Sequence, residues 1–492
     1  MAKLFNIQQD KELYTFIPKR VTDVAMLTYV AALLACSVLY SSHILDWKWW
    51  IFGLVEVLGF FYFANHLSKT WINFTPKLFI KKLFWTAFIL RVIWVVVSYL
   101  LYMDWTGTPF TIDAADELTY NAAAREIAEG MRQGNFNIYA LASFSMGYGT
   151  GISDLGYPMY LGVIYWIFGD SVIIARLIKA VLSAWTAVLM YKLATRNFGE
   201  YTGRMTAILC MLMPNLIYYC SFQLKEVEMV FLCVLFVERA DYLLRQGRLR
   251  WWSTLLLMLI PGYMFMIRTA LAAVMVMAFF LAVLLTTDRI VKWGQRTLLI
   301  LLALVFVGVV FTTSTTIGQD VYEMWETGAS LQEQNMEWRS QREGALSQRF
   351  ARYAGASVFA PMIFTIPFPT MAETPGQENQ KMIHGGNFVK NILSAFTLAS
   401  MFILLFSGDW RKHVLPIAVL CGYLVVLVFS NFAQSERFHM PILSYTLMFA
   451  AYGISKMNQV WWVKRWYPYW CALMFIAAIA WNWFKLAGRG MI

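Results

Sequence analysis

The sequence predicts an all-α polytopic membrane protein with about thirteen transmembrane helices. Of its 492 residues, 59% are hydrophobic and only 14% are charged, whereas a soluble domain carries roughly 25% charged residues. The mean hydropathy is +0.55. Apolar segments recur along nearly the whole chain, and most are long enough to cross a bilayer, which takes about 20 helical residues. Soluble globular and disordered classes are therefore excluded.

The predicted spans follow one another with two long interruptions. The apolar run 157–169 has only 13 residues, too few to cross a bilayer comfortably. We expect it to form a re-entrant or surface helix. The expected spans are 22–42, 48–66, 83–103, 171–194, 203–220, 225–243, 252–267, 270–287, 297–316, 388–407, 413–430, 440–455 and 466–485.

The net charge of +11 orients these spans. Short loops rich in Lys and Arg face the cytoplasm, and those of this chain share one side only if 157–169 does not cross. The N-terminus is then cytoplasmic, and residues 104–170 and 317–387 form two extracytoplasmic loops with surface helices. Residues 104–156 hold seven acids and two bases, a net of −5, and 317–387 hold eight acids and five bases, a net of −3. The positive charge belongs to the rest of a single membrane domain, 1–492, so no nucleic-acid partner is expected.

An acidic motif opens the Ala-rich part of the first external loop. Asp116 and Glu117 precede Tyr120 in a run that favours a helix lying on the membrane surface. Acids in a first helical turn are stabilised by the helix dipole, which is a purely structural explanation. An acid pair at the membrane surface also suits a general base that takes a proton from an acceptor hydroxyl. Both interpretations stay open. The expected apolar face of this helix comprises Leu118, Ala122, Ile127 and Met131.

A second charged group begins a membrane helix. Lys225, Glu226 and Glu228 stand at the external end of the predicted span 225–243. Acids are ordinary in a first turn, and the Lys side chain can extend to the interface. Charges at the start of a membrane helix are nevertheless costly unless they face a cavity or a partner. A structural and a functional role are therefore equally compatible with this group.

Two further groups of cations lie at external helix boundaries. Arg268 separates the spans 252–267 and 270–287, and Arg437 and His439 precede Pro441. An interfacial arginine and a polar turn before a proline are structural explanations. A guanidinium also binds phosphate through paired hydrogen bonds, so these residues are candidate phosphate ligands.

Two charges fall near the middle of predicted spans. Glu56 lies in the second span and Arg91 in the third. A charge inside a membrane is costly unless it is paired. We therefore expect an ion pair between Glu56 and Arg91 that joins the two helices.

Taken together, these motifs resemble the GT-C glycosyltransferases, most closely the protein mannosyltransferase and aminoarabinose-transferase-like branch. The resemblance covers about 110–290 and about 385–455. There are departures: no Lys stands before Pro158, the second acid is Glu226 where many relatives have Asp, and two spans precede the helix that leads into the acidic loop. The motifs are Asp116-Glu117 with Tyr120, Gly156-Tyr157-Pro158, Leu224-Lys225-Glu226, Arg268, and Glu436-Arg437-Phe438-His439-Met440-Pro441.

The resemblance implies a GT-C fold and an enzyme of the bacterial cytoplasmic membrane. Such an enzyme moves a sugar from a polyprenyl phosphate, undecaprenyl phosphate in bacteria, to an acceptor hydroxyl on the external face, with inversion. The acceptor is a lipid, a glycan or a protein, and membrane lipids surround the protein. No cofactor is required, although carboxylates at such a site can bind Mg²⁺ or Mn²⁺, and we commit to no metal ligand. 

The resemblance also assigns roles to the candidate residues. Asp116 is the expected general base, supported by Glu117 and Glu226. The expected ligands of the lipid phosphate are Lys225, Arg268, Arg437 and His439. Further substrate contacts are expected from Tyr120, Tyr157 and Glu228.

Two other functions fit a polytopic membrane protein. A transporter or flippase would place its charged residues near the middle of the membrane, whereas a transferase would gather the carboxylates of Asp116, Glu117 and Glu226 in one external pocket. A glycan polymerase or ligase would use a similar external site and transfer whole chains.

Overall fold

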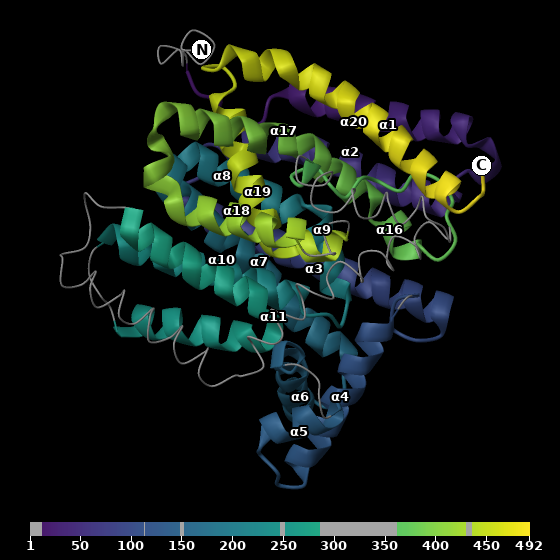
Figure 1. The fold of residues 1–492 in the computed structure, drawn as a ribbon, viewed down its shortest axis with the longest axis vertical. Coiled ribbons are helices and arrows are strands. Elements are labelled where there is room, and N and C mark those ends of the chain that lie inside the picture. The colour runs from purple at the N-terminus through teal and green to yellow at the C-terminus, as the bar shows by residue number, and fades with distance from the viewer. Residues whose placement is uncertain (1–11, 113, 148–151, 247–250, 286–361, 430–434) are drawn as a thin grey trace.

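The computed structural model describes residues 12–112, 114–147, 152–246, 251–285, 362–429 and 435–492, and within these ranges the regular elements are helices (Figure 1). An isolated β-bridge joins Ile44 to Ala372. Eight of the described helices are long and apolar enough to cross a membrane, which agrees with a polytopic membrane protein. The number of thirteen spans stays a prediction: 203–220, 225–243 and 440–455 are not among the eight, 252–267 and 270–287 lie in one helix, and 297–316 lies outside the described residues.

The bounds of the helices match most of the predicted spans. Within the part of the chain that the structure describes, four short 3₁₀ segments connect them: η1 (Ser41–His43), η2 (Ile152–Asp154), η3 (Tyr219–Ser221) and η5 (Asp409–His413). The helices are α1 (Lys19–Leu39), α2 (Trp47–Thr70), α3 (Pro76–Thr106), α4 (Ala115–Arg132), α5 (Ile138–Ser145), α6 (Gly156–Phe168), α7 (Val172–Phe198), α8 (Glu200–Leu212), α9 (Pro214–Tyr218), α10 (Glu226–Gln246), α11 (Trp251–Leu285), α16 (Glu378–Met382), α17 (His384–Ser407), α18 (Val414–Phe429), α19 (Glu436–Lys456) and α20 (Trp461–Gly488).

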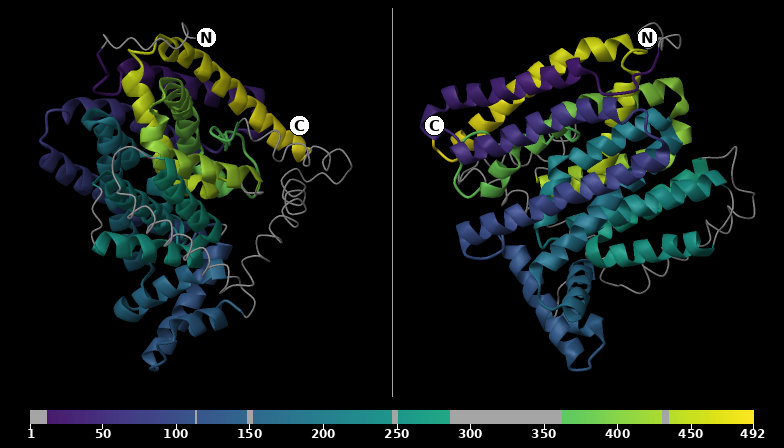
Figure 2. Two further views of the ribbon diagram at one scale, coloured as in Figure 1. Left: turned by 60° about the vertical axis from the view of Figure 1, so that its left-hand side comes forward. Right: turned by 180° about the vertical axis from the view of Figure 1, so that it is seen from behind.

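Helices α4, α5 and α6 form a lobe that projects from one end of the bundle of long helices, at a steep angle to them (Figures 1 and 2). Helix α6 corresponds to the apolar run that is too short to cross. It packs closely on α4, since a Cβ atom at Gly162 would lie 2.6 Å from Ile127. We call the end of the bundle that carries this lobe the lobe end.

Helix α11 contains two of the predicted spans and turns at Arg268. The backbone of Arg268 is extended (φ −160°, ψ 97°) inside an otherwise helical segment. The carbonyl of Ile267 accepts a hydrogen bond from Lys225 at the lobe end of α10. The Phe279 ring lies 6.1 Å from the ring of Phe236, which follows Lys225 by eleven residues. The second half of α11 therefore lies beside α10 and leads away from the lobe end. This agrees with the prediction of two separate spans, 252–267 and 270–287, with a turn between them.

The predicted ion pair between Glu56 and Arg91 is wrong. Among the described residues, Arg91 forms hydrogen bonds and no ion pair. Its guanidinium donates to the carbonyls of Met211 (3.1 Å) and Cys210 (3.2 Å) and to the Ser183 hydroxyl (2.6 Å). Helix α8 ends just before Pro214, so its last carbonyls have no helical partner and carry the negative end of the helix dipole. The arginine satisfies them.

Glu56 is satisfied by the opposite kind of helix end. Its Oε2 accepts a hydrogen bond of 3.0 Å from the Gly386 amide in the first turn of α17. A Cβ atom at Gly385 would lie 2.5 Å from the same oxygen, so glycine permits this close approach. Amides at a helix N-terminus favour a carboxylate. Each charge thus binds a helix terminus instead of an opposite charge.

Arg91→Leu should destabilise the protein on the order of 3 kcal/mol, because buried carbonyls at the end of α8 lose their donors. The measurement is the midpoint of thermal unfolding of the detergent-purified variant. Ile93→Leu, at a side chain that is 54% exposed on the same helix, is the control and should leave the midpoint unchanged. An unaltered midpoint for Arg91→Leu would show that Arg91 does not support this helix end.

Candidate functional site

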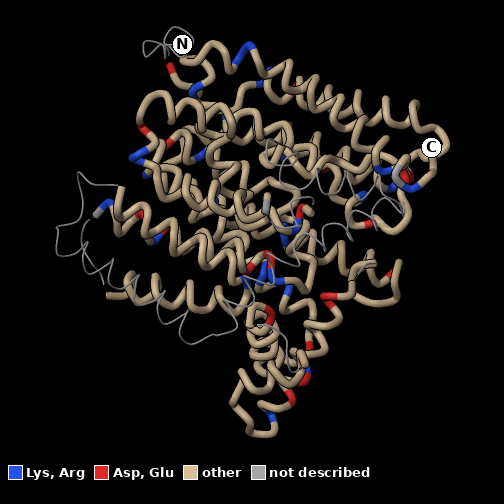
Figure 3. Tube along the Cα trace, in the orientation of Figure 1, with Lys and Arg blue, Asp and Glu red and all other residues tan. Residues whose placement is uncertain are grey.

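The predicted acids and cations gather where the lobe meets α10, α11 and α19, as the red and blue segments in Figure 3 show. The helix ends explain this arrangement. Asp116 and Glu117 lie in the first turn of α4, Glu226 is the first residue of α10, and Arg437 is the second residue of α19. These groups therefore meet at one end of the bundle and not in the middle of its spans.

Arg437 joins two of the acids. Its Nη1 forms an ion pair with Asp116 Oδ2, and its Nε forms one with Glu226 Oε1. The side chain of Asp116 is 55% exposed, whereas that of Glu226 is fully buried. The Oε2 atom of Glu226 has no hydrogen-bond partner among the described residues. Of the two carboxylates, only that of Asp116 is open to a substrate.

Glu117 faces the interior. Its Oε1 accepts a hydrogen bond from the Thr111 hydroxyl (2.7 Å), and its Oε2 accepts one from the backbone N–H of Gln223 (2.8 Å). Arg176 of α7 lies 3.6 Å from Oε2, and both side chains are almost fully buried. Glu117 therefore fixes the start of α4 against the segment that precedes α10, and so positions the neighbouring Asp116.

A second buried ion pair lies beneath the site. Lys179 Nζ lies 3.4 Å from Glu228 Oε2 and 4.8 Å from the ring centroid of Tyr157. The hydroxyl of Tyr157 lies 3.5 Å from Gln223 Oε1. Lys179, Glu228 and Tyr157 are all buried. They support the segment that carries Lys225 and Glu226 from below.

Lys225 already has an acidic partner, Asp154, which the sequence analysis did not select. Lys225 Nζ lies 2.5 Å from Asp154 Oδ1, and the Tyr120 hydroxyl donates to the same oxygen at 3.2 Å. The carbonyl of Ile267 also accepts from Lys225, at 2.9 Å. Partial burial alone would raise the pKa of Asp154, but the nearby Lys225 ammonium and the hydrogen bonds lower it. Asp154 is therefore an anion at neutral pH.

Arg268 and His439 differ in their access to the site. The guanidinium carbon of Arg268 stacks 4.1 Å from the Phe438 ring, and the side chain is partly exposed. Arg268 has no ion pair or hydrogen bond with any residue in the described ranges. His439 is buried in α19. Of the four predicted phosphate ligands, Arg268 is thus the cation whose charge is open to an anion.

Three charged residues of this region, Asp154, Arg176 and Lys179, were not assigned to the site by the sequence analysis, although Arg176 lies in the Ala175-Arg176-Leu177 stretch that resembles the GT-C enzymes and Lys179 was recognised as a charge within a span. The spacing of Arg176 and Lys179, three residues apart in an apolar helix, is a usable signal, because it places two costly charges on one face. Asp154 offers no such pattern, since it lies in a loop. Within the described ranges, no three His, Cys, Asp or Glu side chains form a group suited to a metal ion, so we assign no metal ligand.

Comparison with known proteins adds a second line of support. Residues 155–313 match the model of the dolichyl-phosphate-mannose-protein mannosyltransferase family. The match covers about a third of the 492 residues, and its last part, 286–313, lies outside the described residues. No curated protein shows significant similarity to the chain. Together with the eight long apolar helices, the match supports an integral membrane glycosyltransferase of the GT-C type.

The matched range includes part of the site. Lys225, Glu226 and Arg268 lie inside it, whereas Asp116 and Arg437 lie outside it. The ion pairs of Arg437 connect the two sets, because this arginine contacts both Glu226 and Asp116.

Proposed function

We propose that the protein transfers a sugar from a polyprenyl-phosphate donor, undecaprenyl phosphate in bacteria, to an acceptor hydroxyl. The observation that carries this proposal is the joining of one open carboxylate, Asp116, to a cationic site that includes Arg268, a partly exposed guanidinium with no ion pair to any described residue. An anionic leaving group and a nucleophile that must lose a proton require this pair of features.

Asp116 acts as the general base. It takes the proton of the acceptor hydroxyl while the hydroxyl oxygen forms a bond to the anomeric carbon. The bond between that carbon and the phosphate oxygen breaks, and its electron pair leaves with the lipid phosphate. Attack from the face opposite the phosphate inverts the anomeric centre. Arg268 stabilises the charge on the leaving phosphate.

Arg437 couples the two halves of this reaction. In the structure its charge is shared by Asp116 and Glu226. When Asp116 takes up a proton it becomes neutral, and Arg437 then retains one anionic partner. The lipid phosphate gains negative charge in the same step, because a phosphate diester becomes a monoester. Proton transfer to Asp116 therefore frees the Arg437 guanidinium to stabilise the lipid phosphate in the same step in which that phosphate gains negative charge.

The basic residues at the opposite end of the bundle support a cytoplasmic location of that end. Arg196 binds Asp241 and Glu238 there, and Arg245 donates to the carbonyl of Lys412. Positive charge between spans favours the cytoplasmic side. The lobe end and the site then face the outside of the cytoplasmic membrane, with the N-terminus in the cytoplasm. A glycan polymerase or ligase differs from this proposal in transferring whole chains, which the assay below detects by the mass of the product.

Arg268→Ala should raise the KM for the lipid-phosphate donor by about 10- to 100-fold, the equivalent of one or two charge-assisted hydrogen bonds. The KM for the acceptor should change little. The assay uses the full chain in nanodiscs, polyprenyl-phosphate hexoses as donors, and lipid, glycan and peptide acceptors. Arg132→Ala is the matched control, because Arg132 pairs with Asp170 within the lobe. Unchanged donor KM and kcat in Arg268→Ala would exclude a role in phosphate binding.

A further inference from the structure

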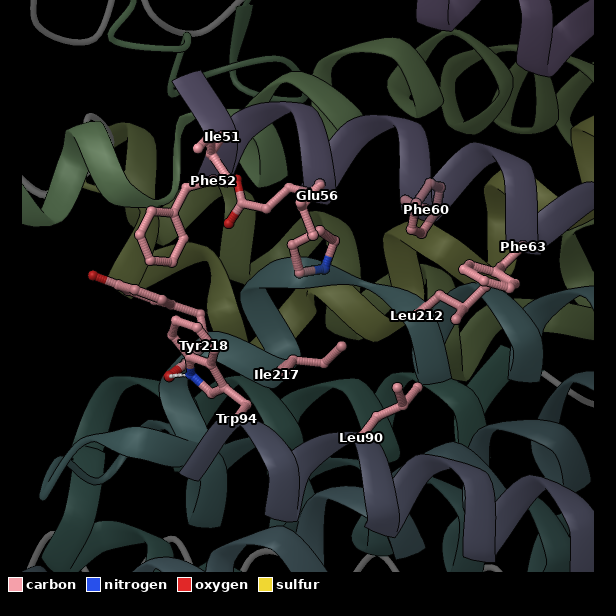
Figure 4. A pocket seen from close by; sticks show the side chains of 13 residues that line it. Ile51, Phe52, Glu56, Phe60, Phe63, Leu90, Trp94, Leu212, Ile217 and Tyr218 are labelled. Carbon is pink, nitrogen blue, oxygen red and sulfur yellow. Dashed lines mark hydrogen bonds between the residues drawn. The ribbon is translucent and has the colours of Figure 1, made fainter. Parts of the chain in front are cut away.

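A narrow groove runs between α2 and α3 on the membrane-facing side of the bundle. The two helices follow each other in the chain, and α8 fills part of the gap between them, as Figure 2 shows from behind. The groove has a volume of about 350 Å³, within the range of about 300–1,000 Å³ for ligand sites. Figure 4 shows its walls, which include Phe52, Glu56, Phe63, Trp94, Leu212 and Tyr218.

The rim of the groove consists of exposed apolar side chains on a candidate membrane span, where lipid would surround it. Ile51, Val55 and Phe63 line it and are 52%, 67% and 47% exposed on a candidate membrane span. Glu56 is the one acid in the lining, and its Oε2 is bound to the Gly386 amide. The remaining lining is aliphatic or aromatic apart from the Tyr218 hydroxyl, which bonds to Asn379, and the Trp94 indole N–H, which donates to the Tyr218 carbonyl. An apolar channel open to hydrocarbon is suited to an apolar occupant.

The dimensions identify the kind of occupant. From Ile51 to Phe63 the groove follows α2 over twelve residues, or about 18 Å at a rise of about 1.5 Å per residue. A helix with its side chains is about 10–12 Å wide, so a length of about 18 Å occupies on the order of 1,500 Å³. That exceeds the whole empty space of the groove, about 960 Å³ with its opening included. One hydrocarbon chain fits the groove, whereas a transmembrane helix of a partner does not.

The groove lies apart from Arg268, the open cation proposed to bind the donor phosphate, and from Lys225. Lys225 and Arg268 belong to the α10–α11 side, and the groove is lined by α2, α3, α8 and α9. Its end at Tyr218 nevertheless adjoins the site: Tyr218 packs on Tyr219 with ring centroids 5.6 Å apart, and the Tyr219 hydroxyl bonds to Glu436 (3.4 Å), next to Arg437. The groove and the donor cations thus reach the site from two sides.

We propose that the groove between α2 and α3 binds a hydrocarbon chain of the acceptor, which makes the acceptor a membrane lipid. This inference rests on the proposed sugar transfer. It gives a function to α2, one of the two spans that precede the helix leading into the acidic loop and that depart from the GT-C pattern. A chain held in the groove keeps the polar part of the lipid near the lobe end, where Asp116 meets its hydroxyl.

Gly59 offers a direct test, because it lines the groove and a Cβ atom there would meet no atom within 4 Å. Gly59→Phe should fill the groove, and Gly59→Ala, the matched control, should leave it open. Each variant is placed in nanodiscs that contain a phospholipid with a photoreactive diazirine in its acyl chain, and labelled peptides are identified by mass spectrometry. Labelling of residues 51–63 and 90–94 should fall at least fivefold in Gly59→Phe and stay at the wild-type level in Gly59→Ala.

A second measurement distinguishes this inference from the proposed function. Labelled polyprenyl-phosphate hexose is supplied with a bacterial lipid extract, and sugar is counted in the lipid product and in added peptide and glycan acceptors. The wild type and Gly59→Ala should glycosylate lipid, and Gly59→Phe should do so at least tenfold more slowly. Transfer only to peptide or glycan, or equal rates and labelling in all three proteins, would overturn the lipid acceptor and leave the transferase intact. Absence of transfer to every acceptor by the wild type would overturn the transferase itself and the acceptor role with it.

Discussion

Asp116→Asn should lower the rate of sugar transfer by about 10²- to 10⁴-fold, the usual contribution of a general base. Asparagine keeps the size of the side chain and an oxygen that can accept from Arg437, but it cannot take the acceptor proton. The variant should therefore fold, bind the donor and fail at the chemical step. Single-turnover measurement of kcat with a saturating donor, together with the midpoint of thermal unfolding, tests both parts.

The neighbouring acids are poor substitutes for Asp116, which is why the expected loss is large. Glu117 is enclosed by Thr111, Gln223 and Arg176, and Glu226 is fully buried beside Arg437. Asp170→Asn is the matched control, since Asp170 is 40% exposed in the lobe region and pairs with Arg132. It removes the same charge and should leave kcat unchanged. Full activity in Asp116→Asn would remove Asp116 from the mechanism.

The structure shows which features the sequence could predict. Apolar segment lengths located the helices, and the charged motifs at segment ends located the region where they meet. The orientation of α4 was predicted less well. Leu118 is 50% exposed, whereas Glu117, Tyr120 and Asn121 are buried with Ile127. The buried face of this helix therefore includes polar residues with specific partners, which a search for apolar periodicity passes over.

Long-range partners set the limit of prediction from sequence. Asp154 and Lys225 are 71 residues apart, and no spacing rule joins a loop residue to a helix start across that distance. The sequence favoured a pair between Glu56 and Arg91 because the two residues have opposite charges within predicted spans. The partial charges at helix ends, which are the actual partners, do not correspond to any residue type and are not visible in a sequence. Pro214 was the visible sign that α8 stops inside the membrane region and leaves free carbonyls for Arg91.

Arg437→Gln should both destabilise the protein and suppress activity, and a second substitution separates the two effects. The single variant leaves the buried carboxylate of Glu226 without its counter-charge. Removing one partner of a buried pair costs about 3–5 kcal/mol, so the midpoint of thermal unfolding should fall clearly. Arg245→Gln, which removes an arginine at the opposite end of α10, is the control for general loss of an ion pair and should not alter the donor KM.

The double variant Arg437→Gln with Glu226→Gln should recover most of the lost stability, because no uncompensated charge remains in the interior. Its activity should stay at least 100-fold below that of the wild type, since one preorganised donor to a developing anion contributes about 2.7–4 kcal/mol to the transition state. The contribution of Arg437 to stability is then measured separately from its contribution to catalysis. A double variant with normal kcat would show that Arg437 only neutralises Glu226, and a single variant with a normal midpoint would show that the buried acid does not depend on it.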